Sequence, residues 1–258
     1  MQLFHRHLGD QGPFLVILHG LFGSSDNWQT IGKALSDLGY RVVLTDLRNH
    51  GQSPHDPTFD LDVMSDDLYE LLLSQSISSP IIIGHSLGGK VAMRFACKFP
   101  SQLSALIVMD IAPKAYTIRH SDIVEALMKV SQQPMTSRKH VEEQLTPLVP
   151  DFAVRQWLMK SLFWKEKDRL DWRFNLPVIA QNLNQAVADC SCAKQIDTPS
   201  LFLRGANSDY VQEGDIGHIQ SNFSAARIDT IPNAGHWLHT ENPDGTLKSI
   251  VAFIKSTE

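Results

Sequence analysis

The stretch Pro80-Ile81-Ile82-Ile83-Gly84-His85-Ser86-Leu87-Gly88 decides the fold expected for this chain. A short apolar run bounded by turn residues is typical of a buried strand, and this run leads directly into a glycine-x-serine-x-glycine turn. The following residues, from Val91 to Phe99, place apolar side chains on one face of a helix, which Pro100 ends. The sequence therefore predicts a strand, a tight turn carrying Ser86, and a helix.

This context makes Ser86 the candidate nucleophile. A strand–turn–helix unit with this motif lifts the serine hydroxyl to the carboxyl end of a sheet. Gly84 and Gly88 must be small so that neighbouring backbone can approach the turn. The backbone N–H of Leu87 would lie at the start of the helix and face the position of an oxyanion. The motif therefore predicts nucleophilic catalysis at Ser86.

Two further loops complete the predicted site. Leu21 lies in His19-Gly20-Leu21, directly after the apolar run Phe14 to Leu18, and is expected to supply the second oxyanion N–H. Phe22, the next residue, would wall the acyl pocket. His236 lies in Gly235-His236-Trp237 after the last predicted strand. Because serine is a poor nucleophile until a positioned base takes its proton, His236 is the candidate general base.

The acid that would orient His236 has two candidates. Asp110 ends the predicted strand Leu103 to Met109, next to the strand that leads to Ser86. Asp209 follows the predicted strand Ser200 to Arg204, after which most chains with such a turn carry their acid. The usual spacing, however, puts that acid at Ser208, one place earlier. A one-residue shift in a tight turn moves a short carboxylate by several ångströms, so Asp110 is preferred and Asp209 is the alternative.

Short apolar runs alternate with helical patterns along most of the chain. This alternation is typical of an α/β fold with a mainly parallel sheet and helices on both faces. From about residue 111 to 192 strand patterns nearly vanish, and helices are expected at 122–130, 137–145 and 151–163. We therefore expect a single domain, 1–258, with a core at about 1–110 and 193–258. The mostly helical insertion at about 111–192 is expected to cap the active site.

Tryptophans are concentrated in this expected cap. Trp157, Trp164 and Trp172 lie there, and Trp237 follows the candidate base. Pockets for small molecules are lined mainly by apolar and aromatic groups, so these side chains are expected to line an acyl channel over Ser86. A core for the cap itself is the alternative role for them.

The bulk composition excludes several classes of function. The 258 residues include 23 Lys and Arg and 28 Asp and Glu, and no basic cluster indicates a nucleic-acid partner. No window approaches the ~18 apolar residues of a membrane span, and no secretory leader is apparent. The scattered histidines and three cysteines form no metal-ligand spacing. We therefore expect a cytoplasmic protein with no metal, no cofactor and no disulfide; Cys190 and Cys192 are too close together for a useful one.

Several motifs together resemble the YbfF-type bacterial esterases, over essentially the whole chain. These motifs are His19–Ser24, Asp46–Ser53, Gly84–Lys90, Asp110–Pro113, Trp172–Asn175 and Gly235–Trp237. The resemblance implies the α/β-hydrolase fold, an eight-stranded, mainly parallel sheet with a cap inserted after strand six, and an acid at Asp110. It also implies hydrolysis of carboxylic esters or thioesters with short to medium acyl chains, acyl-CoA included. The Asp46–Ser53 loop looks structural, with Arg48 and His50 holding the core turn together.

Two other functions remain open at this level. A C–C bond hydrolase would use the same residues on a ring-cleavage product and would need cationic anchors, for which Arg119, Arg155 and Arg173 are candidates. A ligand-binding protein could keep the fold without turnover, because fold alone does not fix function. A haloalkane dehalogenase is excluded because its nucleophile is a carboxylate and position 86 is serine.

Overall fold

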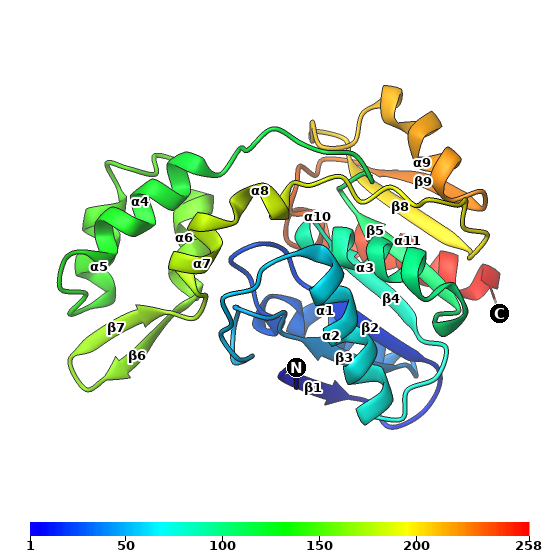
Figure 1. Cartoon of the computed structure of the whole chain (residues 1–258), viewed down its shortest axis with the longest axis horizontal. Coiled ribbons are helices and arrows are strands. Elements are labelled where there is room, and N and C mark those ends of the chain that lie inside the picture. The colour runs from blue at the N-terminus through cyan, green and yellow to red at the C-terminus, as the bar shows by residue number, and fades with distance from the viewer. Residues whose placement is uncertain (258) are drawn as a thin grey trace.

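Seven strands form one central sheet in the computed structural model, which describes residues 1–257 (Figure 1). Their spatial order is β1-β3-β2-β4-β5-β8-β9, and every neighbouring pair is parallel except β1 with β3. The strands are β1 (His5–Leu8), β2 (Phe14–Leu18), β3 (Arg41–Thr45), β4 (Ile81–His85), β5 (Ala105–Met109), β8 (Ser200–Gly205) and β9 (Ala226–Ile231). The predicted α/β-hydrolase fold is confirmed.

The sheet has seven strands in residues 1–257, not the eight expected from the resemblance. The four apolar runs named above are all strands, as are the two further runs predicted at 41–44 and 226–231, and β1 is the one additional member. β1 was not detected because its residues, His-Arg-His-Leu, are polar and only partly buried at the sheet edge. The strand that ends before Asp110 is consequently the fifth along the chain.

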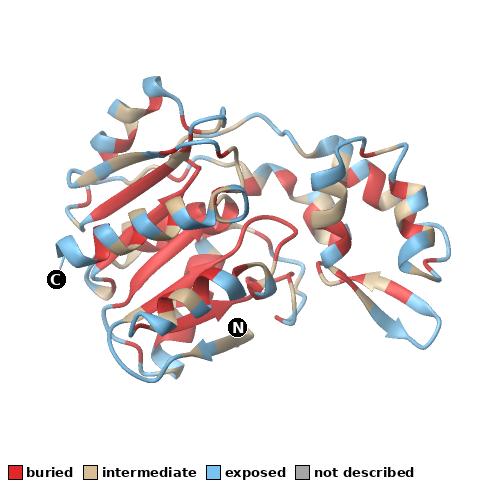
Figure 2. Ribbon diagram, turned by 180° about the vertical axis from the view of Figure 1, so that it is seen from behind, coloured by how far each residue is buried: buried red, intermediate tan, exposed pale blue. Residues whose placement is uncertain are grey.

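Helices cover both faces of the sheet because its parallel strands are apolar on both sides. Along β2, Val16 and Leu18 pack into the core that contains α2 (Leu61–Ser74) and α3 (Leu87–Lys98). Leu15 and Ile17 point to the opposite face and pack with α1 (Gln29–Asp37) and α11 (Pro243–Thr257). Figure 2 shows the resulting burial of the central strands. The remaining core helices are η1 (Ser25–Trp28), η2 (Pro100–Gln102), η3 (Glu213–Asp215), α9 (Ile216–Asn222) and α10 (Leu238–Glu241).

Between β5 and β8 the chain leaves the sheet and forms a separate group of elements to one side (Figure 1). We call residues 111–192 the inserted segment. Side chains cap the N-termini of two of its helices: Ser137 accepts a hydrogen bond from the His140 N–H, and Asp151 accepts one from the Val154 N–H. Its elements are α4 (Ser121–Ser131), α5 (Arg138–Leu145), α6 (Phe152–Lys160), β6 (Leu162–Glu166), β7 (Arg169–Trp172), α7 (Leu176–Gln181) and α8 (Leu183–Ala186).

The antiparallel hairpin β6–β7 was not predicted from the sequence. The helix expected at 151–163 ends at Lys160, and Leu162, Phe163 and Trp164 continue as a strand. Aromatic residues favour strands over helices, and the polar residues between the two strands form the turn. Trp164 therefore lies on a hairpin and not on a helix.

Two motifs that are far apart in the sequence join the inserted segment to the core. The backbone N–H of Asn175 donates to the Asn49 carbonyl at 2.8 Å, and the Asn175 amide donates to the Asn49 side chain at 2.9 Å. Arg48 is buried and forms a bidentate ion pair with Asp67, at 2.6 and 2.9 Å. His50 is buried and its Nδ1 lies 2.9 Å from the Arg48 carbonyl. The structural role predicted for Arg48 and His50 is therefore confirmed.

A disulfide joins Cys97 of α3 to Cys192 at the end of the inserted segment, with the Cα atoms 5.3 Å apart. The expectation of no disulfide was wrong. That argument weighed only the neighbours Cys190 and Cys192, whereas folding lays the end of the inserted segment against α3 and so brings the distant Cys97 within bonding range. Cys190 is a buried free thiol, and burial raises its pKa to about 11.

None of the helices in the described range combines the length and the apolar character that a membrane crossing requires.

Candidate active site

Ser86 occupies a strained turn between β4 and α3. Its φ is +52°, a left-handed conformation that is rare outside glycine and is often found at active sites. The turn needs its glycines: a Cβ on Gly84 would lie 2.3 Å from the Gly88 carbonyl oxygen, and a Cβ on Gly88 would lie 2.4 Å from the Leu18 oxygen. The backbone N–H of Ser86 donates to the Met109 carbonyl at 3.1 Å, which ties the turn to β5.

Asp110 and His236, which are 126 residues apart, meet at the carboxyl ends of β5 and β9. His236 Nδ1 lies 2.8 Å from Asp110 Oδ2. Asp110 is fully buried, and its carboxylate also accepts hydrogen bonds from the Gly205 N–H at 3.0 Å and from the Ser208 hydroxyl. Because a neutral imidazole that donates through Nδ1 accepts at Nε2, this contact leaves Nε2 free to act as a base.

Asp209, the alternative acid, does not contact His236. Its carboxylate forms an ion pair with Arg119 at 2.6 Å, and its side chain is 66% exposed. In the same turn the preceding residue, Ser208, points to Asp110. The one-residue offset seen in the sequence therefore turns Asp209 away from the site.

Two residues at the site were not identified from the sequence. The sequence marked Ser208 only as the position where the acid usually stands. That position in the turn after the strand was the available indication that Ser208 contacts Asp110. Tyr210 stacks on His236 with ring centroids 3.8 Å apart and an interplanar angle of 16°. Arg119 lies over the Tyr210 ring at 4.8 Å, so the connection that leads into α4 contacts a neighbour of His236. No local pattern marks Tyr210.

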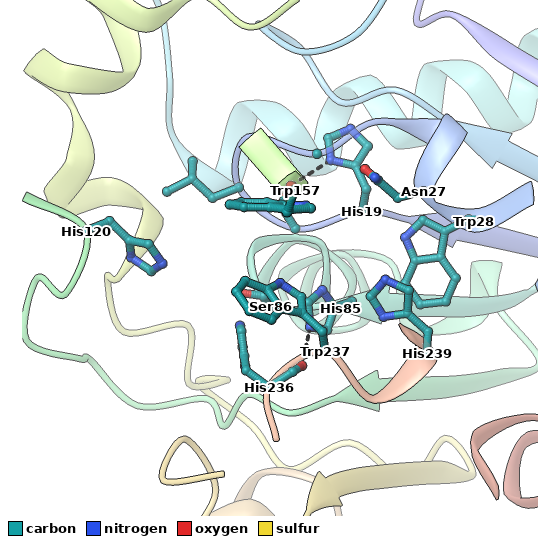
Figure 3. Close-up of a pocket in the computed structure, with 13 residues that line it drawn as sticks. His19, Asn27, Trp28, His85, Ser86, His120, Trp157, His236, Trp237 and His239 are labelled. Atoms are coloured by element: carbon teal, nitrogen blue, oxygen red, sulfur yellow. Dashed lines mark hydrogen bonds between the residues drawn. The ribbon is translucent and has the colours of Figure 1, made fainter. Parts of the chain in front are cut away.

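Two hollows adjoin Ser86. One is shown in Figure 3, and its wall combines Ser86 with aromatic and imidazole side chains: His19, Trp28, His85, His120, Trp157, His236, Trp237 and His239. The second lies along the start of α3, and its lining includes Leu21, Leu87, Lys90, Tyr116, Arg119 and Val187 together with Ser86. Leu21 and Leu87, the predicted oxyanion donors, thus lie beside Ser86, and Leu87 opens α3, where the first N–H groups have no partner inside the helix.

The structure separates the predicted pocket residues into two groups. Trp157 and Trp237 line the hollow beside Ser86, and Phe22 contacts Trp157 with ring centroids 6.0 Å apart. Trp164 is 53% exposed on the hairpin. Trp172 is 3% exposed, donates from Nε1 to Ser131 Oγ at 2.9 Å and stacks on Phe174. Neither Trp164 nor Trp172 lines either of the two hollows beside Ser86, because Trp164 points to solvent and Trp172 is packed inside the apolar cluster that contains Phe174.

The three candidate anion anchors of the C–C hydrolase alternative are likewise dispersed. Arg119 lines the second hollow with Ser86 but is paired with Asp209. Arg155 donates to the Val149 and Pro150 carbonyls. Arg173 lies over the Phe163 ring at 4.8 Å. The described residues therefore offer no cluster of these arginines for a dicarboxylate.

Burial keeps four histidines around Ser86 neutral. Burial lowers the pKa of His19 and of His120 to about 4 and that of His239 to about 3, and it places the pKa of His85 well below its usual value. These four rings are therefore neutral at neutral pH. None of these four rings therefore brings a positive charge to the hollow at neutral pH.

His19 is expected to make folding sensitive to acid. Its Nε2 accepts the Leu47 N–H at 3.0 Å, and its Nδ1 lies 2.8 Å from the Gly20 carbonyl, which fixes a neutral tautomer. Below about pH 6.5 the unfolded chain takes up a proton at His19, whereas the folded chain does so only near pH 4. The free energy of unfolding should therefore fall as the pH drops through this window, by up to about 3 kcal/mol from this group.

Urea denaturation between pH 7.5 and 4 measures this effect. His19→Gln should be less stable than wild type at pH 7.5 but should lose less stability on acidification. His7→Gln, at an exposed position, is the matched control and should follow wild type. Equal pH slopes for wild type and His19→Gln would contradict the assignment.

The comparisons with known proteins agree with this geometry. Residues 13–243 match the alpha/beta hydrolase fold family, and the chain belongs to that family. The sn-1-specific diacylglycerol lipase ABHD11 of Mus musculus is 37% identical over 249 residues, which are 94% of this chain and 81% of that protein. Esterase YbfF of Escherichia coli (strain K12) is 34% identical over 241 residues, 93% of this chain and 92% of that protein.

A solved structure extends the comparison to the backbone. A marine microorganism esterase superimposes with a TM-score of 0.94 at 38% identity, covering 98% of this chain and 99% of that one. The predicted resemblance to YbfF-type esterases is thus confirmed, and the chain is an esterase/lipase-type hydrolase.

Proposed function

We propose that this hydrolase cleaves carboxylic esters or thioesters through an acyl-enzyme on Ser86. The observation that carries the proposal is the contact of His236 Nδ1 with the buried carboxylate of Asp110, in a chain whose strained turn places Ser86 in the same hollow as His236. A nucleophile, a base and an orienting acid, held by three separate strand ends, are the requirements of this chemistry.

The proposed reaction has two halves. Ser86 Oγ bonds to the carbonyl carbon while His236 Nε2 takes the hydroxyl proton, and the carbonyl oxygen becomes an oxyanion facing the Leu21 and Leu87 N–H groups. The bond to the leaving oxygen or sulfur then breaks, and the leaving group receives the proton from His236. Water repeats the sequence on the acyl-enzyme, releasing the acid and restoring Ser86. No metal or organic cofactor takes part.

The inserted segment is proposed to act as a cap that selects the acyl chain. It contributes His120 and Trp157 to one hollow beside Ser86, and Tyr116, Arg119 and Val187 to the other. Aromatic and apolar walls favour apolar acyl groups, and the resemblance to YbfF-type esterases implies chains of short to medium length. The substrates proposed for this chain are therefore small-molecule esters and thioesters, acyl-CoA among them, and no nucleic-acid partner is proposed.

A cytoplasmic location was part of the same prediction. The Cys97–Cys192 disulfide weighs against it, because reducing compartments keep most thiols free. We therefore propose the activity for the protein in which this disulfide is formed. A thiol titration under denaturing conditions counts the free cysteines and so measures whether the disulfide is present.

A panel of p-nitrophenyl esters and acyl-CoA thioesters of graded chain length tests the proposed function and the cap together. Wild type should turn over several of them, with a preference among chain lengths. Trp157→Ala should shift that preference with little loss of thermal stability, because the ring is only partly buried and lines the hollow beside Ser86. Trp172→Ala should instead lower the free energy of unfolding by about 3–5 kcal/mol, as truncation of a buried tryptophan does.

Trp164→Ala is the matched control for both variants, since its ring is exposed away from Ser86. It should leave both the chain-length profile and the stability close to wild type. No turnover of any ester or thioester by wild type would refute the proposed function. A profile shifted by Trp172→Ala and unaltered by Trp157→Ala would refute the role given to Trp157.

A further inference from the structure

A single buried ammonium holds both connections of the inserted segment to the core. Lys90 lies on α3 and is 1% exposed, and its Nζ donates to the Lys114 carbonyl at 2.8 Å and to the Ala188 carbonyl at 2.6 Å. No carboxylate in residues 1–257 lies within ion-pair distance of it. A buried charge without a counter-ion is costly unless other contacts compensate; here the two carbonyls do so, together with the Tyr116 ring, whose centroid lies 5.1 Å from Nζ.

The two carbonyls belong to opposite ends of the inserted segment. Lys114 lies on the connection that leaves β5, and Ala188 lies on the one that returns toward β8 (Figure 1). The connections also bond to each other: the Tyr116 N–H donates to the Val187 carbonyl at 2.9 Å, and the Cys190 N–H donates to the Pro113 carbonyl at 3.0 Å. The two connections therefore form a paired hinge, and Lys90 binds both of them from the side of α3.

This hinge also forms one wall of a hollow beside Ser86. The backbone N–H of Lys90 donates to the Ser86 carbonyl at 3.0 Å, one helical turn away. In the hollow along the start of α3, the core contributes Ser86 and Lys90, and the two connections contribute Tyr116, Arg119 and Val187. Lys114 and Ala188, whose carbonyls Lys90 binds, thus lie within two residues of Tyr116 and Val187, which line this hollow with Ser86.

We propose that Lys90 is a positioning residue: its ammonium fixes the inserted segment at the distance from Ser86 at which an acyl chain is held. The proposal rests on the proposed function of Ser86. Without the ammonium, two carbonyls lose a charge-assisted donor, and the walls that they carry move relative to α3. One such bond changes an equilibrium by about tenfold or more, which sets the size of the expected effects.

Lys90→Met, which keeps the apolar stem and removes the donors, tests the proposal. The KM for p-nitrophenyl octanoate should rise about tenfold, whereas kcat for p-nitrophenyl acetate should change less than about threefold. Amide hydrogen exchange at Tyr116 and Cys190 should become about tenfold faster. Lys90→Arg, which retains donors and charge, should restore most of the protection and of the affinity for octanoate.

Lys98→Met is the matched control, because Lys98 lies on the same helix and pairs with Asp66 near the surface. It should leave KM and exchange at both amides unchanged. Where Lys90→Met does not fold, Lys90→Gln takes its place, and intermediate changes in the same two measurements are expected.

Two results would overturn the proposal. Wild-type exchange and KM in the folded Lys90 variants would make Lys90 a core residue only. A fall in kcat that is equal for acetate and octanoate, with KM unchanged, would assign Lys90 to the chemical step. Failure of the proposed function is separate: wild type would then hydrolyse neither ester, while the exchange result at Tyr116 and Cys190 would still decide whether Lys90 holds the hinge.

Discussion

Replacing Ser86 with alanine should lower kcat for ester hydrolysis by about 10⁶-fold, the size of effect found when a serine hydrolase loses its nucleophile. Alanine supplies no oxygen to bond to the carbonyl carbon, and the oxyanion donors alone give a small residual rate. The fold should persist, because the Ser86 backbone bonds to Met109 and Lys90 do not involve the side chain. Thermal unfolding of the variant should therefore match that of wild type.

A fluorophosphonate probe identifies the nucleophile independently of any substrate. It should label wild type once, at Ser86, as found by mass spectrometry of the digested protein, and should not label Ser86→Ala. Ser104→Ala, at an exposed position before β5, should be labelled and active like wild type. Labelling at another serine, or an active sample without labelling, is incompatible with the assignment.

Asp110→Asn should lower kcat by about 10⁴-fold. The carboxylate of Asp110 accepts from His236, Gly205 and Ser208, whereas the amide of asparagine has one acceptor oxygen and presents N–H groups. The imidazole then takes the wrong tautomer, and the imidazolium that forms during the reaction loses its stabilising charge. Steady-state kinetics of the folded variant measures the loss.

Asp209→Asn is the control for this variant. Because Asp209 is exposed and pairs with Arg119, its loss should change kcat less than about tenfold. A 10⁴-fold drop in Asp209→Asn with nearly normal activity in Asp110→Asn would make Asp209 the acid. Activity in both would mean that neither carboxylate orients His236.

The parts of the site that local rules determine could be predicted from the sequence. The turn at Ser86 needs small residues at Gly84 and Gly88, and a strand before it and a helix after it are visible in the apolar pattern. The one-residue shift in the turn after β8 already favoured Asp110 over Asp209 in the sequence, and the structure adds the contact of Asp110 with His236. The stacking of Tyr210 on His236 could not be predicted, since it depends on how a loop after β8 closes over the ring.

The inserted segment was predicted less well than the core. Its tryptophans look alike in the sequence, but Trp157 lies on a helix that faces the core, whereas Trp164 and Trp172 lie on the hairpin. The residues where the helix ends and the hairpin begins suit either structure locally, and only packing decides between the two. The strand β1 and the Cys97–Cys192 disulfide were not predicted for a related reason: each is determined by a partner that is distant in the chain.

The disulfide has a topological consequence for the whole inserted segment. Cys97 and Cys192 are separated by 95 residues, and the segment through which an acyl chain would be selected lies almost entirely within the ring that they close. In chain-entropy terms, closing a ring of this size disfavours the unfolded state by about 4–5 kcal/mol. A protease that cuts the exposed hairpin therefore opens the ring without dividing the protein: the two fragments stay covalently joined, and they separate only when a reductant breaks the sulfur bond.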